Sequence, residues 1–192
     1  MNVIRYTPTE SDSIGDDSYY AIWVTPPDEI GDDEQIPKKV VFTADVSSSM
    51  EGERLTQLKA ALNVFLDNLQ QGDQFNIITF GTSVQAFEDD LVAATPANLD
   101  AARDFIRRLG AIGLTNINEA LLSSLRQSFS QDYANMIVFM TDGYPTWGET
   151  FVPDILANVE AANTNAVKIF SFGVGENVSK PLLVQMSRDN HG

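Results

Sequence analysis

The chain lacks cysteine altogether, and its 192 residues include a single histidine, His191. Without cysteine there is no disulfide framework, no thiolate zinc site and no cysteine nucleophile. A lone histidine one residue from the end of the sequence is poorly placed to serve as the base of a hydrolase triad. The usual nucleophilic hydrolases are therefore disfavoured.

Positive charge and long hydrophobic runs are also scarce. The sequence has 12 Lys and Arg residues against 27 Asp and Glu residues, a net charge of −15. A surface this negative repels phosphate groups, so nucleic acids and anionic membranes are poor candidate partners. No apolar run approaches the roughly 20 residues that cross a bilayer, so we expect no direct membrane insertion. The acidity instead favours divalent cations.

The excess of acidic residues is concentrated near the N-terminus. Residues 1–34 hold nine acidic residues, with Arg5 as their one basic residue. Aromatic and β-branched residues at 19–24 interrupt this polar segment and predict one strand. We therefore expect residues 1–37 to form an acidic N-terminal extension with one strand, and residues 38–192 to form the main domain.

Beyond residue 38, short apolar runs alternate with segments of helical periodicity. Strands are expected at 40–44, 75–80, 84–87, 136–140 and 167–172. Helices are expected at 55–69, 96–109 and 117–129, from Pro153 and from Ser179. Strands that are apolar on both faces and alternate with helices indicate a parallel sheet covered on both sides. The predicted fold is doubly wound α/β with a mostly parallel central sheet.

Two of the expected strands run into an aspartate, Asp45 and Asp142. If these strands are neighbours, the two carboxylates face each other and need a cation or a proton between them. Ser47 and Ser49 alternate with Asp45, so their hydroxyl groups can join the carboxylates. A set of hard oxygen ligands fits Mg²⁺ or Mn²⁺ and argues against zinc or copper. Alternatively, the Asp-x-Ser-x-Ser segment simply starts a helix, with a serine at its N-cap.

Residues 45–49 resemble the Asp-x-Ser-x-Ser signature of the von Willebrand factor A (VWA) domain. In that family the metal-ion-dependent adhesion site also has a threonine in the loop before a helix and an aspartate after a main strand. Thr115 and Asp142 match these two positions. The resemblance covers residues 38–192 and implies a Rossmann-like fold.

The resemblance also implies a function. Ser47, Ser49 and Thr115 would bind an ion through their hydroxyl groups, and Asp45 and Asp142 would act directly or through water. The ion would be Mg²⁺, with Mn²⁺ or Ca²⁺ as alternatives, and one coordination position would stay open for a carboxylate of a protein ligand. The domain would thus be a non-enzymatic adhesion module, at an extracellular, cell-surface or periplasmic location.

Two aromatic residues follow Asp142, namely Tyr144 and Trp147. Because their loop borders the expected site, both are candidates for contact with the ligand. For Trp147 the simpler alternative is packing beneath the loop.

The sequence departs from the family in two ways. The position between the two serines is often glycine in the family and is Ser48 here, which matters only if the backbone needs a positive φ. The family also adds a strand and a helix after the segment 179–189. We therefore expect the domain to lack its last strand and helix unless the N-terminal segment replaces them. Residues 19–27 and 37–40 resemble the junction in bacterial proteins that join a VIT (vault/inter-α-trypsin) domain to a VWA domain. This resemblance implies that the chain is a piece of a longer protein.

Without a further strand, the segment 167–172 should lie at an edge of the sheet. An exposed apolar edge invites pairing, and the strand at 19–24 is the nearest candidate to cover it.

The main enzymatic alternative is Mg²⁺-dependent phosphoryl transfer with Asp45 as the nucleophile. Phosphatases of the haloacid dehalogenase type also place an aspartate at the end of the first strand. They need a second aspartate two residues later, where this chain has Ser47. Lys168 and Lys180 are the later lysines that could neutralise a phosphate group.

Overall fold

The computed structural model describes residues 2–6, 19–23, 36–175 and 178–192 and divides the chain into two units, Met1–Gln35 and Ile36–Gly192. In the first unit, β1 (Asn2–Tyr6) pairs antiparallel with β2 (Tyr19–Trp23). The sequence predicted one strand in this segment, and its described residues, 2–6 and 19–23, form two. The run Asn-Val-Ile-Arg-Tyr was missed because it is short and mixes apolar and polar residues.

The second unit is built around a six-stranded sheet with the order β5-β4-β3-β7-β8, and β6 pairs with β4 at the other end of that strand. The strands are β3 (Lys38–Asp45), β4 (Gln74–Phe80), β5 (Val84–Ala86), β6 (Val92–Ala93), β7 (Ala134–Thr141) and β8 (Lys168–Gly173). Strands β3, β4, β7 and β8 are parallel to one another, whereas β5 and β6 run antiparallel to β4. The prediction of a mostly parallel sheet is confirmed, and β6 is an addition to it.

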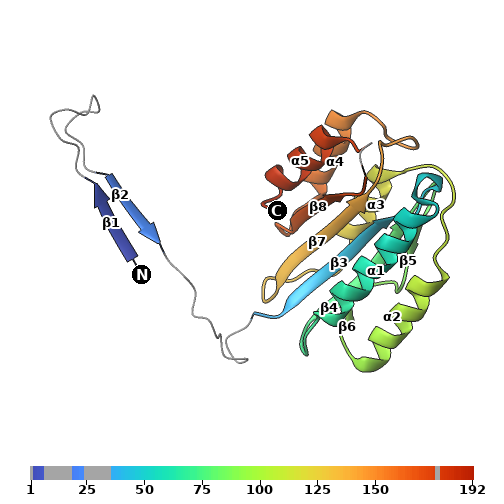
Figure 1. Ribbon diagram of the computed structural model, residues 1–192, viewed down its shortest axis with the longest axis horizontal. Coiled ribbons are helices and arrows are strands. Elements are labelled where there is room, and N and C mark those ends of the chain that lie inside the picture. Colours follow the sequence, from blue (N-terminus) through green and yellow to red (C-terminus); the bar gives the residue numbers. More distant parts are fainter. Residues whose placement is uncertain (1, 7–18, 24–35, 176–177) are drawn as a thin grey trace. The chain divides into compact units, whose positions relative to one another are not determined.

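In the part of the chain that the structure describes, five α-helices cover the two faces of this sheet. They are α1 (Glu53–Asp67), α2 (Pro96–Arg108), α3 (Ile117–Leu125), α4 (Val152–Ala162) and α5 (Lys180–Asp189). Figure 1 shows α1 and α2 on one side of the sheet and α3, α4 and α5 on the other. The doubly wound α/β fold is therefore confirmed.

Alternation along the strands explains why both faces are covered. In β3, Val40 and Phe42 pack against α1 and α2, whereas Val41 packs on the opposite face against the α3 side. Because a strand points successive side chains to opposite faces, an uninterrupted apolar run needs a helical layer on each side. The expected helix over 117–129 ends earlier, at Leu125, but Phe129 still packs in the core.

The outer edge of the sheet is formed by β8, as the sequence predicted; within the described residues β7 is its one strand neighbour. Two backbone N–H groups of β8 point away from β7 and find acceptors in and just after α5. The Ile169 N–H donates to the Asn190 carbonyl oxygen at 3.2 Å, and the Ser171 N–H donates to Ser187 Oγ at 2.9 Å. The end of α5 therefore covers this edge. Strand β2, the expected cover, pairs with β1 in the first unit.

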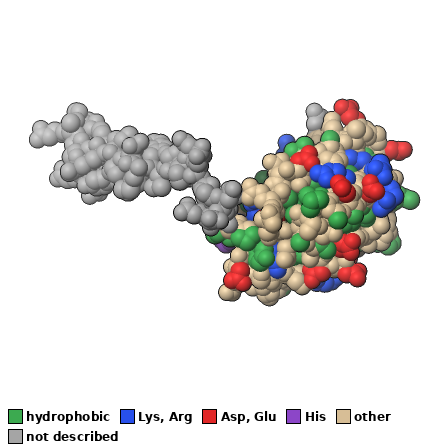
Figure 2. Space-filling model, turned by 90° about the horizontal axis from the view of Figure 1, so that it is seen from below, with side chains coloured by type: hydrophobic (Ala, Val, Ile, Leu, Met, Phe, Trp, Pro, Cys, Tyr) green, Lys and Arg blue, Asp and Glu red, His purple; other side chains and the backbone are tan. Residues whose placement is uncertain are grey.

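The surface of the second unit mixes charges of both signs. On the face seen in Figure 2, acidic and basic side chains are interspersed with small apolar areas. Among the described helices, none is both long and apolar enough to cross a membrane.

Candidate metal centre

The ends of β3 and β7 bring the two predicted aspartates to one edge of the sheet. The strands are parallel neighbours, with Ala44 opposite Met140 in the register. Asp45 therefore ends its strand beside Thr141, and Asp142 follows directly. Both aspartates are buried, with exposed fractions of 0% and 2%. The condition under which the two carboxylates would face each other, that their strands are neighbours, is therefore met.

A run of hydrogen bonds connects the side chains at this edge. Ser47 Oγ and Ser49 Oγ are 3.0 Å apart, and Ser49 Oγ donates to Asp142 Oδ1 at 2.7 Å. Asp45 accepts from the Ser47 backbone N–H at 2.8 Å through Oδ1, and from Thr141 Oγ1 at 2.6 Å through Oδ2. Four of the five predicted ligands thus form one connected group.

The fifth predicted ligand, Thr115, lies in a loop that is bonded to the others through the backbone. The Ser48 N–H donates to the Gly113 carbonyl oxygen at 3.0 Å. On the other side, the Thr146 N–H donates to the Thr115 carbonyl oxygen at 2.9 Å, and the Thr115 N–H donates to Thr146 Oγ1 at 2.9 Å. Thr115 is itself buried. We call Asp45, Ser47, Ser49, Thr115 and Asp142 together the candidate metal centre.

The environment of Asp45 disfavours its charged form. Burial raises the pKa of Asp45 above its usual value, hydrogen bonds from Ser47 and Thr141 oppose this rise, and the negative charge of Asp142 adds to it. A cation placed between the carboxylates would oppose this rise, because it would compensate both negative charges.

The simple helix-start interpretation of the Asp-x-Ser-x-Ser segment receives little support. Ser47 is the N-cap of a short 3₁₀ helix (η2, Ser48–Met50), but its side chain makes no capping hydrogen bond. Its hydroxyl group instead lies beside Ser49 Oγ. Ser48 is not among the described residues with positive φ, so the backbone here does not require the glycine that is common in the family.

A basic residue that the sequence reasoning missed lies at the same place. Arg54, the second residue of α1, donates from Nη1 to Asp142 Oδ2 at 2.7 Å and to the Ser49 carbonyl oxygen at 3.1 Å. A positive side chain in the first turn of a helix opposes the helix dipole. This unfavourable position indicates that Arg54 needs an acidic partner, but nothing in the sequence identifies Asp142 as that partner.

The donor set fits a hard divalent cation. All the candidate side-chain donors are oxygens, which suits Mg²⁺, Mn²⁺ or Ca²⁺ and not metals that prefer nitrogen or sulfur. In the described part of the chain, no three His, Cys, Asp or Glu residues come together as a metal-binding group. The candidate metal centre therefore depends on two carboxylates and three hydroxyl groups.

Exposed apolar side chains lie in the loops that carry the candidate metal centre. Tyr144 is 56% exposed and Trp147 50% exposed, and the Trp147 N–H donates to the Thr115 carbonyl oxygen at 3.2 Å. Ile112 and Leu114, from the loop before Thr115, are exposed as well. Half of Trp147 is accessible, so it is not simply packed beneath its loop.

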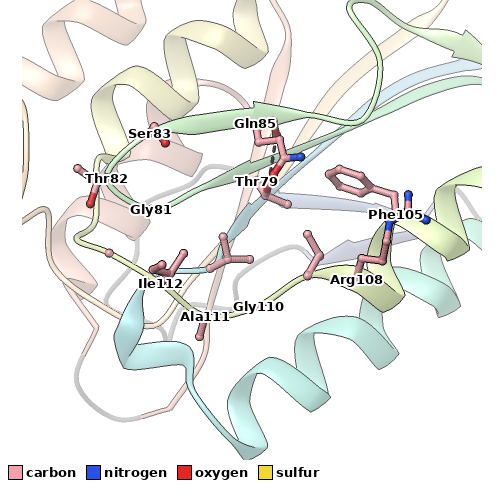
Figure 3. Close-up of a pocket in the computed structure, with 13 residues that line it drawn as sticks. Thr79, Gly81, Thr82, Ser83, Gln85, Phe105, Arg108, Gly110, Ala111 and Ile112 are labelled. Carbon is pink, nitrogen blue, oxygen red and sulfur yellow. Dashed lines mark hydrogen bonds between the residues drawn. The ribbon is translucent and has the colours of Figure 1, made fainter.

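A pocket of about 640 Å³ lies beside the candidate metal centre. Figure 3 shows its position between the turn after β4, at residues 81–83, and the segment 109–113 that follows α2. Val46, which lies within the Asp-x-Ser-x-Ser segment, forms part of its wall. Phe105 and Arg108 from α2 also line it, so the pocket combines apolar surface with one positive charge.

The fold and this edge define the class of protein, a doubly wound α/β domain with an oxygen-lined cluster at the carboxyl ends of its central strands. Residues 38–192 match the model of the von Willebrand factor type A domain family. The chain belongs to this family.

Individual relatives agree with this assignment. Inter-alpha-trypsin inhibitor heavy chain H1 from Bos taurus is 37% identical over 167 residues, which are 83% of this chain and 18% of that protein. The matched part of the chain thus spans less than a fifth of the length of this curated relative.

Solved structures share the fold at lower identity. A von Willebrand factor type A protein from Catenulispora acidiphila has a TM-score of 0.71 and 22% identity, over 79% of this chain and 36% of that one. Proximal thread matrix protein 1 from the mussel byssus, in a structure with a zinc-occupied MIDAS motif, has a TM-score of 0.62 and 20% identity, over 79% of this chain and 41% of that one.

Proposed function

We propose that the second unit is a non-enzymatic protein-binding module that holds Mg²⁺ at the candidate metal centre and captures an acidic side chain of a protein ligand through the ion. The proposal is carried by the connected side chains of Ser47, Ser49 and Asp142, which present oxygens from two different strand ends at one point. Mn²⁺ and Ca²⁺ are the alternative ions. When bound, the ion supplies a Lewis-acid position for an anionic oxygen.

The number of donors supports an open site. Mg²⁺ takes about six oxygen ligands, and the centre has five candidate residues, of which only two are carboxylates. Asp45 and Asp142 already accept hydrogen bonds from neighbouring side chains. An additional oxygen from water or from a ligand is therefore needed to complete the shell, and a carboxylate of a partner protein supplies both the oxygen and a compensating charge.

The surroundings support a protein as the ligand. Tyr144 and Trp147 expose large aromatic surfaces on a loop that is bonded to the Thr115 loop, and such side chains are frequent at binding hot spots. The neighbouring pocket offers room for a second side chain of the same ligand. Arg108 at its wall favours a ligand that is acidic there too.

Phosphoryl transfer by Asp45 has less support. Both of its carboxylate oxygens accept hydrogen bonds, and the residue has no exposed surface. Ser47 stands where this mechanism needs a second aspartate. We therefore propose that the domain binds and does not catalyse.

The wider context is also a proposal. The relative reported above is named after inter-alpha-trypsin inhibitor, which agrees with the resemblance to a VIT-plus-VWA junction in a longer protein. That relative comes from an animal, so it gives no support to the bacterial source that the junction suggested. An adhesion role would place the domain outside the cytoplasm, at the cell surface, in the periplasm or in the extracellular space.

Calorimetric titration of the metal-free protein with MgCl₂ and MnCl₂ tests the proposal directly. We expect one saturable site per chain, and we expect binding to be lost in Asp142→Asn with the fold retained. Asp154→Asn is the matched control, because Asp154 is an exposed carboxylate in the first turn of α4. Equal affinity in the two variants would remove the metal-site proposal.

A further inference from the structure

The guanidinium group of Arg54 lies against Asp142, one of the five residues of the candidate metal centre. Its Nη1 donates at 2.7 Å to Asp142 Oδ2, and the side chain of Asp142 has no exposed surface, whereas that of Arg54 is 38% exposed. The same nitrogen donates to the Ser49 carbonyl oxygen at 3.1 Å. A Cβ atom at Gly175 would lie 3.4 Å from Arg54 Nε, so the guanidinium spans from the loop after β3 to the segment after β8.

This contact uses the second oxygen of Asp142, because its Oδ1 already accepts from Ser49 Oγ. The carboxylate is therefore held on both sides, by a hydroxyl group and by a positive charge. A buried carboxylate without such a partner would be costly, and one with a charged partner at this distance is strongly stabilised. Arg54 thus does for Asp142 what a bound cation would do.

We propose that Arg54 is the built-in counter-cation of the candidate metal centre and lowers the affinity of that centre for divalent ions. This inference rests on the proposed function. The two carboxylates carry two negative charges, and Arg54 cancels one of them. A divalent ion that binds beside Asp142 meets the repulsion of the guanidinium group, or it gains Asp142 only when Arg54 moves into solvent. Arg54 therefore acts as a positioning residue, and it sets the ion concentration at which the site fills.

This role predicts that the charge of residue 54, and not only its shape, determines the affinity for Mg²⁺. Arg54→Gln removes the charge but keeps a hydrogen-bond donor of similar reach. Arg54→Lys keeps the positive charge and loses the planar, forked guanidinium group. Arg103→Gln is the matched control, because Arg103 is equally exposed at 38% and pairs with Asp67 and Asp100, which lie outside the centre.

The experiment titrates the four metal-free proteins with MgCl₂ by calorimetry and records their melting temperatures without metal. We expect Arg54→Gln to bind Mg²⁺ about tenfold more tightly than the wild type, or tighter still, while its metal-free form melts at a lower temperature. Arg54→Lys should bind within a few-fold of the wild type, and Arg103→Gln should bind as the wild type does. Binding that is detectable only in Arg54→Gln would support the proposal as well.

Other outcomes would overturn the counter-cation role of Arg54. If Arg54→Gln binds Mg²⁺ with the wild-type affinity or more weakly, Arg54 does not oppose the ion, and the metal site survives without the counter-cation role. If Arg54→Lys gains as much affinity as Arg54→Gln, charge is not the cause. If none of the four proteins binds Mg²⁺, and MnCl₂ gives the same result, the metal site itself fails and the role of Arg54 fails with it.

Discussion

Ser49 Oγ donates a 2.7 Å hydrogen bond to Asp142 Oδ1, joining two residues that are 93 positions apart in the sequence. The bond ties the loop after β3 to the residue after β7, so the two halves of the candidate metal centre hold each other in place. The parallel register of β3 and β7 sets the distance between the two loops.

The first prediction concerns Asp45→Asn in the metal-free protein. Burial raises the pKa of Asp45 in the folded state, so the folded protein holds this proton to higher pH than the unfolded chain does. The stability that the protonated form contributes is complete below the unfolded pKa and is lost as the pH rises through the folded pKa. Asparagine has no charge to bury, so Asp45→Asn should be more stable than the wild type at pH 7.

Urea unfolding of both proteins at a series of pH values, in the presence of a chelator, measures this effect. The difference in the free energy of unfolding should be small at acidic pH and grow in favour of Asp45→Asn as the pH rises. Mg²⁺ should stabilise the wild type at pH 7 and leave Asp45→Asn unchanged. A constant difference at all pH values would contradict the burial of a charged Asp45.

The second prediction concerns the loop before Thr115. Gly113 has a φ of +86°, and a Cβ atom built there would lie 2.5 Å from Thr82 Oγ1. Gly113→Ala should therefore cost about 1 to 3 kcal/mol of stability, because it combines backbone strain with a steric clash. It should also weaken Mg²⁺ binding, since the Gly113 carbonyl oxygen accepts from the Ser48 N–H.

Gly110→Ala is the control for this loop. Gly110 has no atom within 4 Å of its built Cβ and is not among the residues with positive φ. Thermal melts and calorimetry of the two variants make the comparison. Equal melting temperatures would show that the loop adapts to a side chain at Gly113 and does not depend on its backbone conformation.

Much of this architecture could be predicted from the sequence, because its strands are apolar on both faces and its helices have clear periodicity. The residues at 40–44 and 136–140 predict central strands, and each central strand ends in a polar segment. Asp45 and Asp142 could therefore be assigned to one edge of the sheet. Their proximity also requires that β3 and β7 are neighbours, which the sequence left as a condition and the strand pairing supplies.

Other features could not be predicted, because they depend on tertiary contacts. The sequence does not indicate that Arg54 reaches Asp142, since that contact crosses from α1 to the end of β7. The cover of β8 by Ser187 and Asn190 depends on where α5 ends against the sheet. The strand β1 is too short and too mixed in polarity to be distinguished from a loop.

The third prediction concerns the coordination shell. In a crystal of the protein grown with MnCl₂, anomalous diffraction should locate one ion at the candidate metal centre. At least one oxygen bound to it should come from outside the five residues, from water, a buffer carboxylate or an acidic side chain of a neighbouring molecule. A shell completed by another residue of this domain would indicate a closed structural site, and the adhesion role would lose its main support.

The last prediction concerns the edge strand β8. Ser187 Oγ accepts from the Ser171 N–H, which points away from β7, and no other strand of the described residues lies on that side. Ser187→Ala should lower the stability by about 1 kcal/mol, because it removes the acceptor of a partly buried donor. It should also promote association, because an edge with an unpaired N–H group can accept another chain. Thermal melts and analytical ultracentrifugation measure the two effects.

Ser123→Ala is the control, since Ser123 Oγ donates to Glu119 on α3. If both variants melt alike and stay equally monomeric or oligomeric, water replaces the Ser187 hydroxyl group, and the carbonyl group of Asn190 alone is enough to protect the edge.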